Sequence, residues 1–228
     1  MIANQSHVRI AGMLFLLAMV ASLTGGFLLE SILNAPDYLS AVHFRANLLR
    51  TGVVLEMINA LSVIGIAVIL YPVLRTFSER MALGYFAFRL IESIACVFAA
   101  VIPLLIMNLV KGHTQAGMPQ GSNLQNLGVT LLATRNMIAS LLIPLFYSLG
   151  ALLFYFLLFQ TSLIPRFISI WGLIGVLGIL IIAFTGIKGS LVMVFALPII
   201  MNELFLGVWL IVKGFNPTKI YNQNHENN

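Results

Sequence analysis

The sequence alternates between long apolar runs and short polar segments. Six apolar runs can be drawn, and they cover residues 10–29, 48–74, 81–110, 137–159, 167–187 and 191–212. A helix needs about 20 predominantly apolar residues to cross the hydrocarbon core of a bilayer. Within hydrocarbon every backbone N–H and C=O must be bonded inside the chain, so each run is expected to be helical. The pattern therefore predicts an all-α fold: a polytopic integral membrane bundle of six transmembrane helices.

The segments between these runs differ in length. Those at 75–80, 160–166 and 188–190 are tight, whereas those at 30–47 and 111–136 are long. After Pro36 and Asp37, the first long segment has apolar residues at helical spacing, namely Leu39, Val42, Ala46 and Leu49. This spacing predicts an amphipathic helix leading into the second span. Residues 122–133 are expected to do the same before the fourth span.

The chain is predicted to be one domain followed by a tail. Residues 1–214 form the six-span domain, and residues 215–228 form a polar tail without apolar periodicity, which is expected to be disordered. The first run could instead be a signal peptide, because Arg9 precedes it. However, a run of about 20 residues is longer than the usual apolar region of a signal, and no clean A-x-A site ends it. It is therefore interpreted as a retained span.

Composition supports membrane insertion. Of the 228 residues, 60% are hydrophobic and 8% are charged, and the mean hydropathy is +1.02. Soluble domains carry about 25% charged residues, so this chain could not cover a water-facing surface. The formal net charge is +5. In a membrane protein such an excess is typical of basic residues near anionic lipid, and no basic cluster with interleaved aromatics points to nucleic acid.

Basic residues and tryptophans suggest an orientation. Six basic residues fall on the side of the termini and five on the other side, a slight excess that favours cytoplasmic termini. Trp171 and Trp209 would then lie near the inner boundary, where aromatic belts occur. The expected location is the inner (plasma) membrane of a bacterial cell, with both termini cytoplasmic and membrane lipids as partners.

Several polar residues interrupt the apolar runs. Arg89 and Glu92 are three residues apart and share a helix face. Two further acids are each close to an asparagine, and these pairs are Glu56 with Asn59 and Glu203 with Asn202. A charge at mid-membrane costs about 2.5–3.5 kcal/mol on insertion scales, so such residues face a bundle interior and find partners. They could fix helix packing, or they could form a site for a ligand, an ion or a proton.

Counting residues along the helices suggests which charges meet. Arg89 lies about 12 Å from the inner end of its span, and Glu203 about 15 Å from the inner end of the sixth. We therefore expect Arg89 to pair with Glu203 across the bundle, with Glu92 as a second contact. By the same reasoning Glu56 should approach Arg135 near the outer mouth, because a long basic side chain can reach down across the interface.

No catalytic or metal-binding motif is recognisable. The single cysteine, Cys96, lies in an apolar run, and its simplest interpretation is a small buried side chain. His43 and His113 lie in the long connections without ligand spacing, and no serine sits in a nucleophile motif. Neither a metal nor a cofactor is predicted. Glycines at 172, 175 and 178 form a small-residue ridge that favours close helix packing.

Several stretches occur together in a familiar order. They are RIAG at 9–12, FR at 44–45, FRLIES at 88–93, SLIPRFISIWGLIGVLG at 162–178 and ELFLGVWLIVKG at 203–214. In this combination the chain resembles the bacterial integral membrane family catalogued as domain of unknown function 4386. The resemblance covers almost the whole chain and implies a multi-span bacterial membrane protein. The family has no established activity, so the resemblance assigns no catalytic residue.

Three functions remain open on these observations. The first is handling of a small molecule or an ion at an intramembrane polar site made of Glu56, Asn59, Arg89, Glu92, Arg135, Asn202 and Glu203. The second is a structural or accessory subunit whose buried charges only fix helix packing. The third is an intramembrane enzyme, for which no nucleophile or metal is visible.

Overall fold

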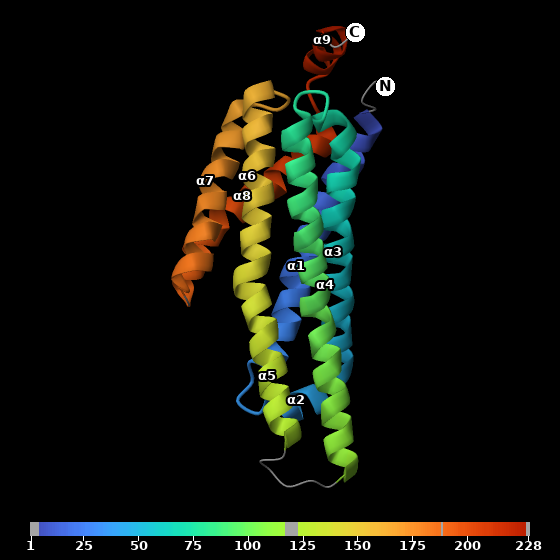
Figure 1. Cartoon of the computed structure of the whole chain (residues 1–228), viewed down its shortest axis with the longest axis vertical. Helices are drawn as coiled ribbons and strands as arrows, with labels where there is room; N and C mark the ends of the chain where they lie inside the picture. The colour runs from blue at the N-terminus through green and yellow to red at the C-terminus, as the bar shows by residue number, and fades with distance from the viewer. Residues whose placement is uncertain (1–4, 117–122, 188, 227–228) are drawn as a thin grey trace.

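The computed structural model describes residues 5–116, 123–187 and 189–226, and these residues are helical over most of their length, with no strand among them. Figure 1 shows an elongated bundle. The helices are α1 (Gln5–Leu33), α2 (Tyr38–Phe44), α3 (Ala46–Leu74), α4 (Glu79–Ala116), α5 (Asn123–Met137), the π-helix η1 (Ile138–Leu142), α6 (Ile143–Thr161), α7 (Arg166–Thr185), α8 (Ser190–Val212) and α9 (Pro217–Glu226).

Six helices within the described part of the chain are long and apolar enough to cross a membrane. They are α1, α3, α4, the continuous helix formed by α5, η1 and α6, then α7 and α8. The predicted six-helix transmembrane fold is thereby confirmed. The fourth span differs at its start, because the helix that was expected to begin at residue 137 continues unbroken from α5. The polar residues Asn126, Thr130 and Thr134 lowered the hydropathy there without ending the helix.

The predicted lead-in before the second span is present as α2. Asp37 caps this helix by accepting a hydrogen bond from the backbone N–H of Ser40 at 3.2 Å. The Ser40 side chain and this backbone N–H together hold the pKa of the Asp37 carboxyl below its usual range. Arg45 has φ −111° and ψ 29°, which separates α2 from α3. The connection is therefore a short helix and a bend, not a smooth extension of α3.

The six spans form a closed ring. Neighbours around the ring are α1, α3, α4, α6, α7 and α8 in that order, and α8 packs back against α1. Close packing of α1 on α8 depends on glycine, since a Cβ on Gly12 would lie 2.7 Å from the backbone oxygen of Gly207. The predicted ridge on α7 acts similarly, because a Cβ on Gly175 would lie 2.9 Å from the backbone of Ile199 in α8.

The ring is not equally tall on all sides. Helix α7 has 20 residues and α4 has 38, which correspond to about 30 Å and about 57 Å at 1.5 Å per residue. In Figure 1 the turn between α7 and α8 lies well short of the end reached by α4 and α5. Below that turn the bundle continues as α1, α2, α3, α4 and α5.

The part of the bundle that contains all six spans and the part beyond the turn between α7 and α8 each have a hydrophobic core. One core includes Val8, Leu70, Phe154, Ile168 and Leu206, and joins all six spans. The other lies at the end away from the termini, around α2, and includes Leu29, Val42, Leu49, Ile106 and Val110. The outer part of the bundle therefore has its own core, to which α7 and α8 contribute no described residue.

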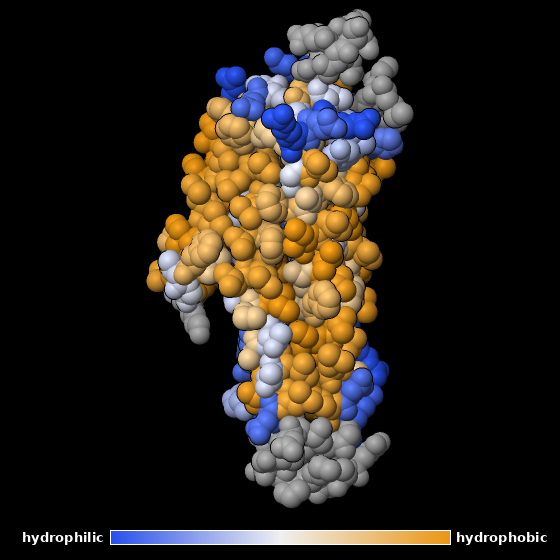
Figure 2. Space-filling view, in the orientation of Figure 1, coloured by the Kyte–Doolittle hydropathy of each residue, from blue (hydrophilic) through white to orange (hydrophobic). Residues whose placement is uncertain are grey.

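The surface carries a broad apolar belt with polar residues at both ends (Figure 2). Large apolar side chains are exposed on the spans, for example Phe27, Leu61, Phe98, Ile174 and Val194. A soluble protein rarely exposes contiguous apolar patches of this extent. The belt is the surface expected to contact lipid, and the protein is an integral membrane protein.

Both ends of the chain lie at the same end of the bundle (Figure 1). The Gln5 side-chain amide donates a hydrogen bond to the backbone oxygen of Phe215 at 2.9 Å and links the two ends directly. Residues 217–226, for which disorder was expected, form α9 instead. Pro217 begins this helix, the Asn216 side chain accepts a hydrogen bond from the N–H of Thr218, and Ile220 is buried against the first core.

Candidate functional site

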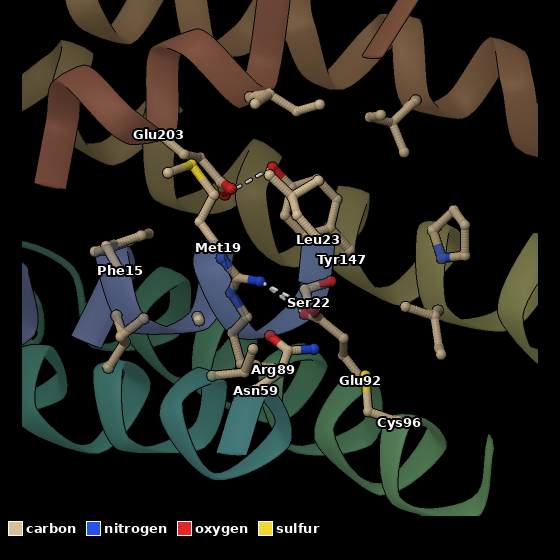
Figure 3. A pocket seen from close by; sticks show the side chains of 17 residues that line it. Phe15, Met19, Ser22, Leu23, Asn59, Arg89, Glu92, Cys96, Tyr147 and Glu203 are labelled. Carbon is tan, nitrogen blue, oxygen red and sulfur yellow. Dashed lines mark hydrogen bonds and ion pairs between the residues drawn. The ribbon is translucent and has the colours of Figure 1, made fainter. Parts of the chain in front are cut away.

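The centre of the helix ring contains a cavity of about 240 Å³, here called the central cavity, whose mostly apolar lining includes several polar side chains. All six spans contribute to its lining. Its polar lining residues include Asn59, Arg89, Glu92, Tyr147 and Glu203, which Figure 3 shows from close by. Three of the predicted intramembrane charges therefore meet around one space in the middle of the bundle.

Arg89 and Glu92 are held on one face of α4. The Arg89 Nη1 atom donates to both carboxylate oxygens of Glu92, at 2.8 and 3.1 Å, and the Arg89 side chain is only 4% exposed. The guanidinium also lies over the Tyr147 ring, 5.0 Å from its centroid, and near the Tyr85 ring at 5.7 Å. Two aromatic rings and one carboxylate thus stabilise the buried cation.

Glu203 takes a different partner from the one expected. Its carboxylate accepts a hydrogen bond from the Tyr147 hydroxyl at 2.8 Å. No ion pair within 4.0 Å joins Arg89 to Glu203, and the Arg89–Glu92 pair is the ion pair found within the described residues. The predicted Arg89–Glu203 pair is therefore wrong, whereas the predicted second contact, with Glu92, is present. Tyr147 of α6 contacts both the arginine and the Glu203 carboxylate instead. Counting residues along the helices placed Arg89 and Glu203 at a similar depth, and the two do line one cavity. It could not predict that Tyr147, from a third helix, would contact both of them.

A second cavity of about 380 Å³, here called the outer cavity, adjoins the first. The two share five lining residues, which are Ser22, Leu23, Asn59, Cys96 and Ile143. The polar residues of the outer cavity include Glu30, Glu56 and Arg135. None of its described lining residues comes from α7 or α8.

Arg135 is buried in the wall of the outer cavity. The residue is only 7% exposed, and its Nε atom has no hydrogen-bond partner. Its hydrogen bond within the described structure goes from Nη1 to the neighbouring Asn136 side chain at 3.3 Å. Glu56 and Arg135 line the same cavity, as their predicted approach requires, but they do not form an ion pair within 4.0 Å.

The backbone is irregular where the two cavities join. Residues Ile138–Leu142 form a single turn of π-helix, in which the N–H of Ile143 bonds to the oxygen of Ile138. Pro144 follows and cannot donate a backbone hydrogen bond. Ala139 and Ile143 line the outer cavity, and Pro144 lines the central one. Single π-turns inside long helices are frequent at functional sites, so this turn is consistent with a site here.

Asn202, the remaining predicted residue, does not line either cavity. It is fully buried and its side-chain amide donates to the backbone oxygen of Ile168 at 2.8 Å, which joins α8 to α7. Ser93 joins α4 to α3 in a comparable way, by donating to the backbone oxygen of Ala60 at 2.8 Å. These neutral hydrogen bonds hold neighbouring helices together.

Sequence reasoning did not include Tyr147, Glu30 or Cys96 among the site residues. Tyr147 was one aromatic among many in an apolar run, and Glu30 was taken as part of a loop. For Tyr147, the usable signal in the sequence was its hydroxyl within an apolar span, because a buried tyrosine hydroxyl usually has a hydrogen-bond partner. Within the described residues no three His, Cys, Asp or Glu side chains gather as a metal site would require.

Comparison with known proteins identifies the family. The family described as Domain of unknown function (DUF4386) matches residues 10–214, so the chain belongs to this family. Searches of curated proteins and of solved structures found no significant match. The family description carries no activity, and the site must therefore be interpreted from its own geometry.

Proposed function

We propose that the protein handles a small polar molecule or an ion within the membrane, at a site formed by the central and outer cavities. The observation that carries this proposal is that Arg89, Glu92 and Glu203 line one cavity while Glu30, Glu56 and Arg135 line the next. Ionisable groups in a membrane interior are costly, and they persist where they serve a ligand, an ion or a proton path.

The alternative, a purely structural role for the charges, fits the contacts less well. A structural role would place ion pairs between helices. Within the described chain, the ion pair found joins two residues of α4 and ties no helices together. Hydrogen bonds of Ser93 and Asn202 and the close packing at Gly12 provide contacts between helices without any charge. Arg89 and Glu203 do contact Tyr147 of α6, but Glu30, Glu56 and Arg135 of the outer cavity form no ion pair within 4.0 Å in the described structure and are available to a ligand.

For location, we propose the inner membrane of a bacterial cell with both termini in the cytoplasm. The position of both chain ends at one end of the bundle supports a shared side. The slight excess of basic residues at that end favours the cytoplasmic side. The outer cavity would then lie towards the opposite face of the membrane.

The native cysteine provides a direct test of the proposed function. Cys96 is the single cysteine of the protein and lines both cavities. Purified protein in detergent would be treated with 2-aminoethyl methanethiosulfonate, a small cationic thiol reagent, and the reaction followed by intact mass. If the cavities admit small polar molecules, Cys96 should react despite being 3% exposed.

A matched control makes the result interpretable. Ala151 is 1% exposed, belongs to the first hydrophobic core and lines neither cavity. An Ala151→Cys variant with Cys96→Ser should react at least about tenfold more slowly, since it needs local opening of the core to react. Equal rates for the two cysteines would show that the cavities are closed to polar solutes, and the proposed function would be wrong.

A further inference from the structure

The proposed function does not specify the ligand, and the residues of the outer cavity indicate its chemical class. Resting on that function, we propose that the outer cavity takes the head group of a zwitterionic phospholipid bearing an ammonium group, which enters sideways from the bilayer between α1 and η1. The acyl chains would remain in the lipid next to α1.

The first step of the argument is the position of the opening. Helices α7 and α8 close the ring between α6 and α1, but they end at the turn between Thr185 and Ser190. The outer cavity has lining residues from α1, α5 and η1 and none, among those described, from α7 or α8. The cavity is thus walled by α1 and η1 on the side where the shorter hairpin gives no cover.

The second step is the character of the rim. Leu23 and Phe27 both line the outer cavity, and they are 52% and 72% exposed on the apolar surface of α1. Side chains that face both the cavity and the surface mark its mouth. An apolar mouth within the apolar belt favours a molecule that arrives from lipid over a solute that arrives from water.

The third step is the unpaired cation. Arg135 is only 7% exposed, has an unpartnered Nε atom, and makes no ion pair within 4.0 Å in the described structure. Glu30 and Glu56 line the same cavity, but neither lies within ion-pair distance of the guanidinium, so its buried Nε–H lacks an acceptor, which is unfavourable. The planar guanidinium matches the oxygens of a phosphate, with two parallel hydrogen bonds. A phosphodiester would provide the direct acceptors that neither carboxylate supplies.

The fourth step concerns the two carboxylates. Glu56 and Glu30 line the same cavity as Arg135, so a purely anionic ligand would meet two like charges. An ammonium group would donate hydrogen bonds to them. Gly26 leaves space in front of Glu56, because a Cβ there would have the Glu56 Oε1 atom as its nearest neighbour at 3.7 Å. Opposite charges within one cavity therefore select a zwitterion.

Volume is consistent with a head group and not with a whole lipid. The outer cavity measures about 380 Å³, near the lower end of the roughly 300–1,000 Å³ typical of small-molecule sites. Only the polar part of a phospholipid would be enclosed, and the tails would lie along exposed apolar side chains such as Phe27.

The experiment compares three probes by thermal unfolding of the purified protein in detergent. The probes are dioleoyl-phosphatidylethanolamine, dioleoyl-phosphatidylglycerol and water-soluble glycerophosphoethanolamine. At saturation we expect the first to raise the Tm by about 5 °C, the anionic lipid to raise it by less than half as much, and the soluble head group to have no effect. The shift should disappear in Arg135→Gln.

Two variants serve as controls. Arg50→Gln removes the same charge from an exposed position of α3 at the same end, and it should keep the full shift. At Gly26 an added Cβ would meet only the Glu56 Oε1 atom, at 3.7 Å, so the larger side chain of Gly26→Leu should fill the space before Glu56 and abolish the shift. Because Gly26→Leu leaves all charges in place, it tests binding in the outer cavity even if Arg135→Gln does not fold.

Each contrary result has a defined meaning. Equal shifts with both lipids would overturn the zwitterion assignment, and an equal shift with glycerophosphoethanolamine would overturn entry from the bilayer. No shift with any probe, while Cys96 still reacts faster than the thiol of the Ala151→Cys control, would overturn the lipid proposal alone. No shift together with an unreactive Cys96 would overturn the proposed function as well.

Discussion

At the scale of residues, Arg89 forms its ion pair within its own helix, α4. Its partner is the Glu92 carboxylate, and the rings of Tyr85 from α4 and Tyr147 from α6 also lie against the guanidinium. Glu203 belongs to the same cavity but is held by the Tyr147 hydroxyl. The two carboxylates, although they share one cavity, should therefore contribute very differently to stability.

Substitution of the two glutamates tests this difference. Glu92→Gln removes the buried counter-charge of Arg89 and should lower the free energy of unfolding by about 3 kcal/mol. Glu203→Gln keeps an acceptor for Tyr147 and should cost about 1 kcal/mol. Unfolding in mixed detergent–SDS micelles would measure both. Adding Arg89→Gln to Glu92→Gln should recover part of the loss, with a coupling above about 0.5 kcal/mol.

A larger loss of stability for Glu203→Gln than for Glu92→Gln would contradict the contacts described for Arg89. If Glu203→Gln proved the more destabilising, Arg89 would depend on the carboxylate of α8, as depth counting along the helices predicted. Arg166→Gln is a suitable control, because this arginine is exposed and lines neither the central nor the outer cavity, and its removal should have little effect.

At the scale of elements, the helices are positioned by small residues and by one irregular turn. Glycines allow α1 to approach α3 and α8 closely, as the short distances around Gly12, Gly25, Gly52 and Gly207 show. The π-turn η1 shifts the register between α5 and α6, because each extra residue rotates the following side chains by about 100°. Arg135 precedes this turn and Tyr147 follows it, so the turn sets how the two face the cavities.

Two glycines of α1 should respond oppositely to substitution. Gly12→Leu would place its Cβ 2.7 Å from the backbone oxygen of Gly207, which must push α8 away and cost about 1–3 kcal/mol or more. Gly26→Ala meets its nearest atom at 3.7 Å and should stabilise the helix by about 0.5–1 kcal/mol. Both effects can be read from unfolding in mixed micelles. A tolerated Gly12→Leu would mean that α1 and α8 do not pack as described.

At the scale of the whole molecule, the ring encloses two adjoining cavities with polar lining residues and is taller on one side. The termini lie at one end, and the second core and the outer cavity lie towards the other. This asymmetry gives the molecule two chemically different ends. The two cavities meet at Asn59 and Cys96, which line both.

Labelling of introduced cysteines tests the orientation in cells. In a Cys96→Ser background, Ser190→Cys lies at the turn between α7 and α8, and Thr218→Cys lies in α9. Both positions are exposed. With cytoplasmic termini, an impermeant thiol reagent should label position 190 in intact cells and position 218 only after lysis. Labelling of position 218 alone in intact cells would reverse the orientation.

The sequence by itself determined the class and the vertical arrangement of this protein. Hydrocarbon admits only helices with internally bonded backbones, so the apolar runs could be counted as spans. The even number of spans placed both ends together. Depth also followed from the sequence, because each helical residue adds about 1.5 Å along the axis, and Arg89 and Glu203 do line one cavity.

The tertiary structure alone decided which way each side chain faces and what it meets. Rotation of a helix about its axis depends on packing against its neighbours, and in lipid no water-facing side fixes it in the sequence pattern. Tyr147 therefore came to contact both Arg89 and Glu203 from α6. For the same reason Asn202 faced α7 instead of the cavity, and Arg135 was left beside an open space. The polar residues could be read from the chain, but the cavities exist only where the helices around them fail to fill the ring.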